Sequence, residues 1–233
     1  MKIPNLIMPD SPNFSCGPTR KPDIWKVKNL NQQFLGRYHR SEDVIEYVKN
    51  IILRIKKTLN IPKQYELIIT PGSTTGAMEA VIWSFLGENE VTTIVYDYWA
   101  VLWANDLKKL KLKIDLRYSL DGKIPSLENI PKVNDVLFVW TGTSTGMSVN
   151  NCDFIKDRQE GLVISDITSG VFIYDIPWSK LDVSVFSWQK ALGGESQHGM
   201  VVISPKAKKR LKKKKTIPKV LDLARHDYLI NTP

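Results

Sequence analysis

Cysteine, histidine and long apolar runs are all scarce in this chain of 233 residues. Its two cysteines, Cys16 and Cys152, predict neither a disulfide framework nor a metal knuckle, and they favour a reducing, cytoplasmic location. Its three histidines are scattered without the spacing of metal ligands, so we expect no metal site. No apolar run reaches the roughly 18 residues of a membrane span, and the first residues lack the apolar region of a signal peptide.

Acidic residues are also few relative to basic ones, 24 against 33, which gives a formal net charge of +9. Much of the excess lies in one run at residues 206–215. Such a run could bind nucleic acid or an anionic surface, which would make the chain a basic, non-catalytic binding protein. The run contains no aromatic side chains on which bases could stack, so we interpret it as a solvated helix and keep nucleic-acid binding as the alternative.

Hydrophobic residues make up 42% of the chain, enough for a sizeable core, and their pattern changes along it. Residues 1–40 are predicted to be irregular, and a helix is expected between Ser41 and Pro62. From residue 66 onward, apolar runs of strand length alternate with helical segments such as 74–86 and 99–110. We expect residues 41–233 to form one large domain.

Strands that are apolar throughout and separated by helices are typical of a parallel sheet covered on both faces. We therefore predict an α/β fold with helices on both faces of a mainly parallel sheet. About seven strands are expected, at residues 66–70, 92–96, 113–118, 136–140, 162–166, 183–188 and 200–204.

Polar groups follow several of these predicted strands, at the edge of the sheet where ligands bind in such folds. A glycine- and hydroxyl-rich turn at residues 71–76 precedes a helix and could bind a phosphate group. Trp99 could offer a flat face to a planar ring, Thr143 lies in a hydroxyl-rich loop, and Asp166 ends an apolar strand. Each group has an ordinary alternative: a helix cap, a core tryptophan or a structural carboxylate.

Lys190 follows the apolar strand at residues 183–188 and precedes Gly193 and Gly194. A lysine amine withdrawn from water is a nucleophile that forms Schiff bases with aldehydes and ketones. Taken alone, Lys190 is more simply a surface lysine past the end of a strand. Together with an anion site, a flat aromatic face, hydroxyl donors and a carboxylate, it completes the set of groups that pyridoxal 5'-phosphate requires.

Three stretches of the sequence carry a more specific signal. They are NFSCGP at residues 13–18, YHRS at residues 38–41, and SWQKALGGE at residues 187–195 together with His198 and Gly199. With these motifs the chain resembles, over nearly its whole length, the class V aminotransferase group of fold-type I pyridoxal-phosphate enzymes. More narrowly, it resembles the phosphoserine aminotransferase family, whose large domain it would represent.

The resemblance implies roles for individual residues at the cofactor. Lys190 would bind the cofactor aldehyde covalently and carry a proton between substrate and cofactor. Asp166 would pair with the pyridine nitrogen, and Trp99 would stack on the ring. The remaining cofactor contacts would come from four polar side chains, Thr74, Thr75, Thr143 and Gln189.

Other residues implied by the resemblance act across the interface of a homodimer. His39 and Arg40 would bind the substrate phosphate, for which a bidentate arginine is well suited. Asn231 and Thr232 would reach the cofactor phosphate of the neighbouring subunit.

The reaction that the resemblance implies belongs to serine biosynthesis. An amino group would move between 3-phosphoserine with 2-oxoglutarate and 3-phosphohydroxypyruvate with glutamate. Another class V enzyme, such as an alanine–glyoxylate or serine–glyoxylate aminotransferase, is the alternative, although such substrates carry no phosphate for His39 and Arg40 to bind.

The chain also departs from the family pattern. Its phosphate turn contains Ser73, Thr74 and Thr75 where some members carry glycine and arginine, and the loop around Thr143 lacks a frequent asparagine. The family's small C-terminal domain, which binds the substrate carboxylate, would follow Pro233. We therefore expect a truncated large domain that lacks this substrate clamp and is inactive on its own.

Overall fold

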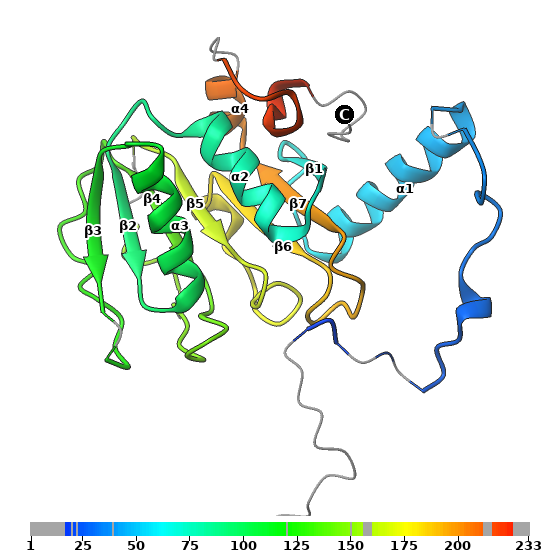
Figure 1. The fold of residues 1–233 in the computed structure, drawn as a ribbon, viewed down its shortest axis with the longest axis horizontal. Helices are drawn as coiled ribbons and strands as arrows, with labels where there is room; N and C mark the ends of the chain where they lie inside the picture. The colour runs from blue at the N-terminus through cyan, green and yellow to red at the C-terminus, as the bar shows by residue number, and fades with distance from the viewer. Residues whose placement is uncertain are drawn as a thin grey trace, which may run out of the picture.

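The fold is built around one β-sheet. The computed structural model describes residues 17–19, 21, 23–38, 40–119, 121–149, 151–155, 160–211 and 216–225. Within these ranges, seven strands form one sheet with the order β1-β7-β6-β5-β4-β2-β3 (Figure 1). Their bounds are β1 (Glu66–Pro71), β2 (Val91–Val95), β3 (Ile114–Tyr118), β4 (Asp135–Val139), β5 (Val163–Asp166), β6 (Val183–Ser187) and β7 (His198–Ile203). The predicted strands and the α/β fold are confirmed.

The sheet is mainly parallel, as predicted. β2 pairs in parallel with β3 and β4, and β5 pairs in parallel with β4 and β6. β7 is the exception, because it runs antiparallel between β1 and β6. The strands β2, β4, β5 and β6 are buried along their whole length, which is why their sequences are largely apolar and do not alternate.

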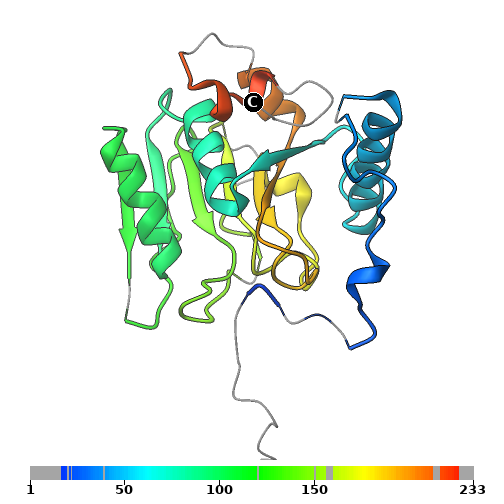
Figure 2. The ribbon, with the colours of Figure 1, turned by 45° about the vertical axis from the view of Figure 1, so that its right-hand side comes forward.

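Helices cover both faces of the sheet. The described helices are α1 (Glu42–Thr58), α2 (Ser73–Phe85), α3 (Tyr98–Lys109) and α4 (Pro205–Leu211), with the 3-10 helices η1 (Val27–Asn29), η2 (Trp178–Lys180), η3 (Lys219–Leu221) and η4 (Leu223–Arg225). α2, α3 and α4 pack on one face, in a core that includes Phe85 and Trp103. α1 contributes Ile52 to a second core beside Phe186, and Figure 2 shows α1 and α3 on opposite sides of the strands. No helix in the described ranges is both long and apolar enough to cross a membrane.

The C-terminal end of α1 differs from its prediction. We expected the helix to continue to Pro62, but it ends at Thr58. Asn60 adopts a left-handed conformation with φ 51°, and the N–H groups of Asn60 and Ile61 bond carbonyl groups of the last helical turn. This C-terminal motif satisfies the carbonyl groups that the helix itself leaves unpaired, so the helix stops before the proline can interrupt it.

α4 corrects our interpretation of the basic run as a solvated helix. Its Ala207 and Leu211 are buried, and Lys206 and Arg210 make polar contacts with the body of the protein. Only part of this run therefore faces water, because α4 packs along one face of the sheet. Residues 212–215 lie outside the described residues.

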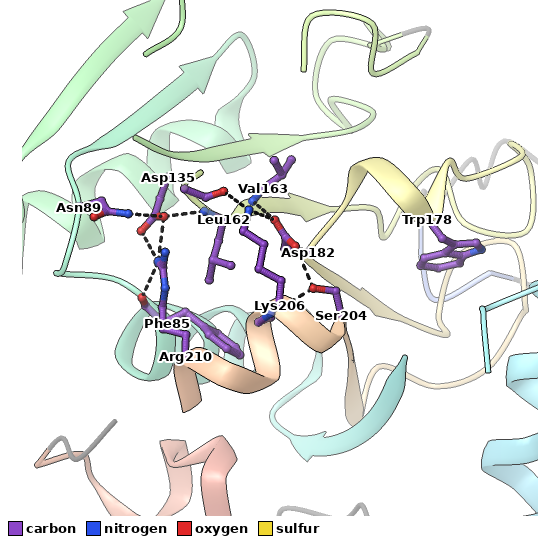
Figure 3. A network of polar contacts seen from close by, with 12 residues as sticks. Phe85, Asn89, Asp135, Leu162, Val163, Trp178, Asp182, Ser204, Lys206 and Arg210 are labelled. Carbon is purple, nitrogen blue, oxygen red and sulfur yellow. Dashed lines mark hydrogen bonds and ion pairs between the residues drawn. The ribbon is translucent and has the colours of Figure 1, made fainter. Parts of the chain in front are cut away.

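The polar contacts of α4 form a network at the edge of the sheet where β4, β5 and β6 begin (Figure 3). Arg210 Nη1 donates to both carboxylate oxygens of the fully buried Asp135, at 2.8 and 2.7 Å. Lys206 Nζ donates to Asp182 Oδ2 at 3.1 Å, and Asp182 also accepts from the N–H of Val163 at 3.0 Å. These pairs join the basic helix to three strands and neutralise a carboxylate that water does not reach.

Replacing Arg210 tests the contribution of this network to stability. In Arg210→Met the Asp135 carboxylate stays buried without its cation, so we expect the free energy of unfolding to fall by about 3 kcal/mol. Arg54→Met, at an exposed position of α1, should change it by less than about 0.5 kcal/mol. Urea denaturation measures the free energy of unfolding of both variants. If Arg210→Met changed it as little as Arg54→Met does, the Arg210 cation would not be needed for stability.

Candidate active site

The opposite edge of the sheet, where the parallel strands end, opens into a cavity of about 360 Å³. In parallel sheets this is the edge at which ligands bind. The predicted cofactor residues that lie in the described ranges all line this cavity. They are Thr74, Thr75, Trp99, Thr143, Asp166, Gln189 and Lys190. The fold thus gathers residues that are distant in the sequence.

The other predicted site residues are not part of this cavity. Arg40 is exposed just before α1 and does not line it. His39, Asn231 and Thr232 lie outside the described residues. A neighbouring, more apolar cavity of about 410 Å³ between residues 31–37, α1 and β1 contains none of the predicted cofactor residues.

The turn between β1 and α2 is shaped by its small residues. Gly72 has a left-handed φ of 81°, and a Cβ on Gly76 would collide with the backbone that precedes the helix. The turn starts α2 abruptly, so the N–H groups of Thr74 and Thr75 have no helical acceptor. Unused N–H groups and the helix dipole together favour an anion at this point.

Hydroxyl groups from two neighbouring strand ends hold the Thr74 side chain. Thr74 Oγ1 lies 2.5 Å from Ser187 Oγ and 2.9 Å from Thr168 Oγ1. Ser187 ends β6, and Thr168 follows β5. The cluster therefore ties the start of α2 to β5, which ends at Asp166, and to β6, which precedes the loop containing Lys190. Sequence analysis assigned no role to Ser187 or Thr168, because no local pattern shows that they face the same threonine.

Asp166 is a buried carboxylate, with 5% of the residue exposed. Its Oδ1 accepts from the backbone N–H of Thr168 at 3.0 Å, and its Oδ2 accepts from the indole N–H of Trp103 at 3.3 Å. Burial raises the pKa of Asp166, the hydrogen bonds from Thr168 and Trp103 lower it in part, and nearby Asp97 raises it further. None of these influences comes from a cation of the described residues, and a cation in the cavity would favour the ionised carboxylate.

Lys190 lies in the loop between β6 and β7 and is half-buried. The N–H of Gly193, which has a left-handed φ of 71°, donates to the carbonyl of Lys190 at 2.9 Å. The N–H of Gly194 donates to the carbonyl of Trp188 at 2.6 Å. The two glycines thus close a turn directly behind the lysine, and the Lys190 side chain lines the cavity that also contains Asp166.

An N-terminal strap, consisting of Gly17, Thr19 and Lys21, lies against this loop. Thr19 donates to the carbonyl of Gln189 through its N–H at 2.8 Å and its hydroxyl at 3.0 Å, and the hydroxyl lies 2.8 Å from the carbonyl of Lys190. A Cβ on Gly17 would lie 3.1 Å from Lys190 Cδ, and Lys21 pairs with a loop carboxylate at 2.8 Å. In Figure 1 the dark-blue strap lies just below the gold loop. Of the motif at residues 13–18, Gly17 and Pro18 belong to this region, and residues 13–16 lie outside the described residues. The motif did not indicate that the strap would contact the loop at Lys190.

Comparison with known proteins assigns the family. The family described as Aminotransferase class-V matches residues 26–226. The chain belongs to the class V aminotransferases. Phosphoserine aminotransferases from Methanosarcina mazei and Methanosarcina barkeri are 45% and 42% identical to it over 206 residues. The matches cover 88% of this chain and 56% of each relative, so the chain spans little more than half the length of these curated proteins.

A solved structure agrees with the fold of this class V aminotransferase. The phosphoserine aminotransferase of Trichomonas vaginalis, described as bound to pyridoxal phosphate, aligns with a TM-score of 0.72 at 17% identity. The alignment covers 91% of this chain and 62% of that chain. The likeness confirms the predicted fold-type I architecture, including the sheet on whose edge the cavity lies.

The buried carboxylate of this class V aminotransferase predicts a stability difference that depends on pH. Because the folded state raises the pKa of Asp166, ionisation of Asp166 destabilises the fold. Without added ligand, the stability of Asp166→Asn relative to wild type should therefore be higher at pH 7 than at low pH. The difference should shrink as the pH falls through the raised pKa and stop changing below the ordinary value of 3.8, where the wild-type carboxyl is protonated in both states.

Urea denaturation at a series of pH values measures this difference. Asp121→Asn, at an exposed position, serves as the control. A gain in Asp166→Asn that does not depend on pH would contradict the explanation.

Proposed function

We propose that the protein is a phosphoserine transaminase that uses pyridoxal 5'-phosphate in serine biosynthesis. It would move an amino group between 3-phosphoserine with 2-oxoglutarate and 3-phosphohydroxypyruvate with glutamate. The observation that carries the chemistry is the single cavity that Lys190 shares with the buried Asp166. The choice of substrate rests on the phosphoserine aminotransferases that are 45% and 42% identical to this chain.

The polar groups of the cavity suit this cofactor. Gln189 Oε1 is buried and has no hydrogen-bond partner among the described residues, an arrangement that a bound hydroxyl group would complete. Asp166 suits a protonated ring nitrogen, and the N–H groups of Thr74 and Thr75 suit a phosphate. Trp99 is 36% exposed and has a ring face available for stacking. When bound, pyridoxal phosphate supplies an electron-withdrawing ring that makes the α-proton of an amino acid acidic.

Lys190 carries the catalytic role in this proposal. Its Nζ would bind the cofactor aldehyde in the resting enzyme and, when free, would accept and return the proton of the substrate α-carbon. The strap residue Thr19 fixes the backbone carbonyls of Gln189 and Lys190. The lysine side chain can therefore move while its backbone stays in place. Thr143, whose hydroxyl lies 2.6 Å from Ser169 Oγ, is assigned with Gln189 to cofactor hydrogen bonding.

The substrate phosphate requires cations that this cavity does not supply. Lys190 is the single Lys, Arg or His side chain among the described residues that line it. Arg40 is exposed and lies outside the cavity of its own chain, so we assign it, with His39, to the active site of a second copy in a homodimer. Asn231 and Thr232 are assigned to the cofactor phosphate of the neighbouring subunit.

The remaining assignments concern the chain as a whole. Residues 41–233 would be the cofactor-binding large domain. The substrate carboxylate would be bound by residues in the part of the relatives that this chain does not match. Cys152 is a buried free cysteine, which supports a reducing cytoplasm as the location.

Lys190→Ala tests the chemistry. Because the alanine variant has no amine in the cavity, we expect it to lose the visible absorbance of a lysine-linked cofactor and the covalent label left after borohydride reduction. Lys56→Ala is the matched control, since Lys56 is also half-buried but donates to the backbone carbonyl of Tyr65, away from the cavity. Spectroscopy and peptide mass spectrometry measure both effects. An unchanged covalent label in Lys190→Ala would contradict the assignment of Lys190 as the residue that binds the cofactor.

Arg40→Ala tests the choice of substrate. A bidentate arginine–phosphate contact is lost, so we expect affinity for phosphoserine to fall by roughly tenfold or more. Affinity for serine and alanine, which carry no phosphate, should be unchanged. Arg37→Ala, three residues earlier at an exposed position, is the control. Calorimetric titration separates the outcomes, and an equal loss for all three amino acids would favour a glyoxylate aminotransferase instead.

A further inference from the structure

Trp103 is a buried residue of α3 to which the proposed function assigns no role. It is 2% exposed and lies one helical turn after Trp99, on the same face of the helix. The two indole rings are neighbours, with centroids 6.3 Å apart and planes inclined by 31°. Trp103 therefore contacts the wall of the cavity although it does not line the cavity itself.

The polar atom of Trp103 is directed at the carboxylate that the cavity contains. Its indole N–H donates to Asp166 Oδ2 at 3.3 Å, while the backbone N–H of Thr168 donates to Oδ1 at 3.0 Å. Two carboxylate oxygens offer about four acceptor sites in all. The Thr168 side chain also interacts with this carboxylate, so at least one acceptor site stays open for a further donor. These contacts with Trp103 and Thr168 fix the orientation of the carboxylate and leave acceptor capacity for a group in the cavity.

Packing alone does not explain this arrangement. Trp178 is also buried, but its N–H donates to the backbone carbonyl of Leu59 at 2.9 Å. The N–H of buried Trp140 has no partner among the described residues. Of these three tryptophans, Trp103 alone donates to a charged group. A phenylalanine would fill much of the same space without bringing a buried N–H that needs an acceptor.

We propose that Trp103 is a positioning residue whose N–H holds Asp166 ionised and turned toward the nitrogen of a cationic heterocycle in the cavity. The inference rests on the proposed function and deepens it, because it names what keeps the ring-nitrogen partner in its working state. In support, the hydrogen bonds from Trp103 and Thr168 both lower the pKa of Asp166 against the effect of burial.

The test compares two ligands that differ at one ring atom: pyridoxal 5'-phosphate and its 1-deaza analogue, in which carbon replaces the ring nitrogen. Trp103→Phe should bind pyridoxal phosphate about five- to tenfold more weakly, because a hydrogen bond to a charged group is lost. Its affinity for the deaza analogue should change by less than about twofold, since that ligand has no nitrogen for Asp166 to meet. Calorimetry on the purified protein measures all affinities.

Trp178→Phe is the matched control, because it removes a buried indole N–H from the second core, away from the cavity. It should leave both affinities unchanged. A second replacement, 3-benzothienylalanine at position 103, keeps the bicyclic ring and removes only the N–H, so it should show the same ligand-selective loss even if phenylalanine disturbs folding. In an Asp166→Asn background, Trp103→Phe should have no further effect on pyridoxal phosphate affinity.

Two results would overturn the role of Trp103 while leaving the proposed function intact. One is an unchanged affinity for pyridoxal phosphate in both position-103 variants. The other is an equal loss for both ligands, which would mean that Trp103 acts through Trp99 or through packing. If wild type binds neither ligand, the proposed function fails and this inference fails with it.

Discussion

A carboxylate that is taken out of water loses several kcal/mol of hydration unless donors or cations replace it. Asp166 is held in this condition, with two N–H donors and no ion-pair partner in the described part of the chain. The surrounding architecture depends on it: β5 ends at Asp166, α3 supplies one donor, and the backbone after β5 supplies the other. The site is therefore electrostatically incomplete in a way that one class of ligand, a cation with an N–H, can correct.

The two edges of the sheet treat buried charge in opposite ways. Where β4 begins, Asp135 is matched by Arg210, and the carboxylate beside the start of β6 is matched by Lys206. Where β5 ends, Asp166 shares its cavity with a lysine but forms no ion pair with it in the described structure. Charges at the first edge are satisfied within the chain and support stability. The second edge keeps unmet polar capacity, which is the property expected of a binding site.

The predictable and unpredictable features differ in the range of the contacts they need. The strand positions could be predicted from the sequence because strands buried on both faces consist mainly of apolar residues. The grouping of residues at one edge of the sheet could also be predicted, because parallel strands end at the same edge. The hydrogen-bond partners of Asp166 and Lys190 could not be predicted. The Trp103–Asp166 hydrogen bond joins residues 63 positions apart, and the Thr19–Lys190 hydrogen bond joins residues 171 positions apart. Composition likewise revealed the charge of α4, but not the buried carboxylate that Arg210 would meet.

The position of β7 has a consequence for how the protein assembles. β1 is at one edge of the sheet, and its strand partner is β7, which is the last strand along the chain. The turn that follows β1 and begins α2 therefore joins the sheet only after roughly 130 intervening residues have been made and folded back, a closure whose entropy cost grows slowly with length. The turn at residues 71–76 is thus encoded early but joins the sheet late. It is joined to the sheet through β7, the strand that directly follows the loop containing Lys190.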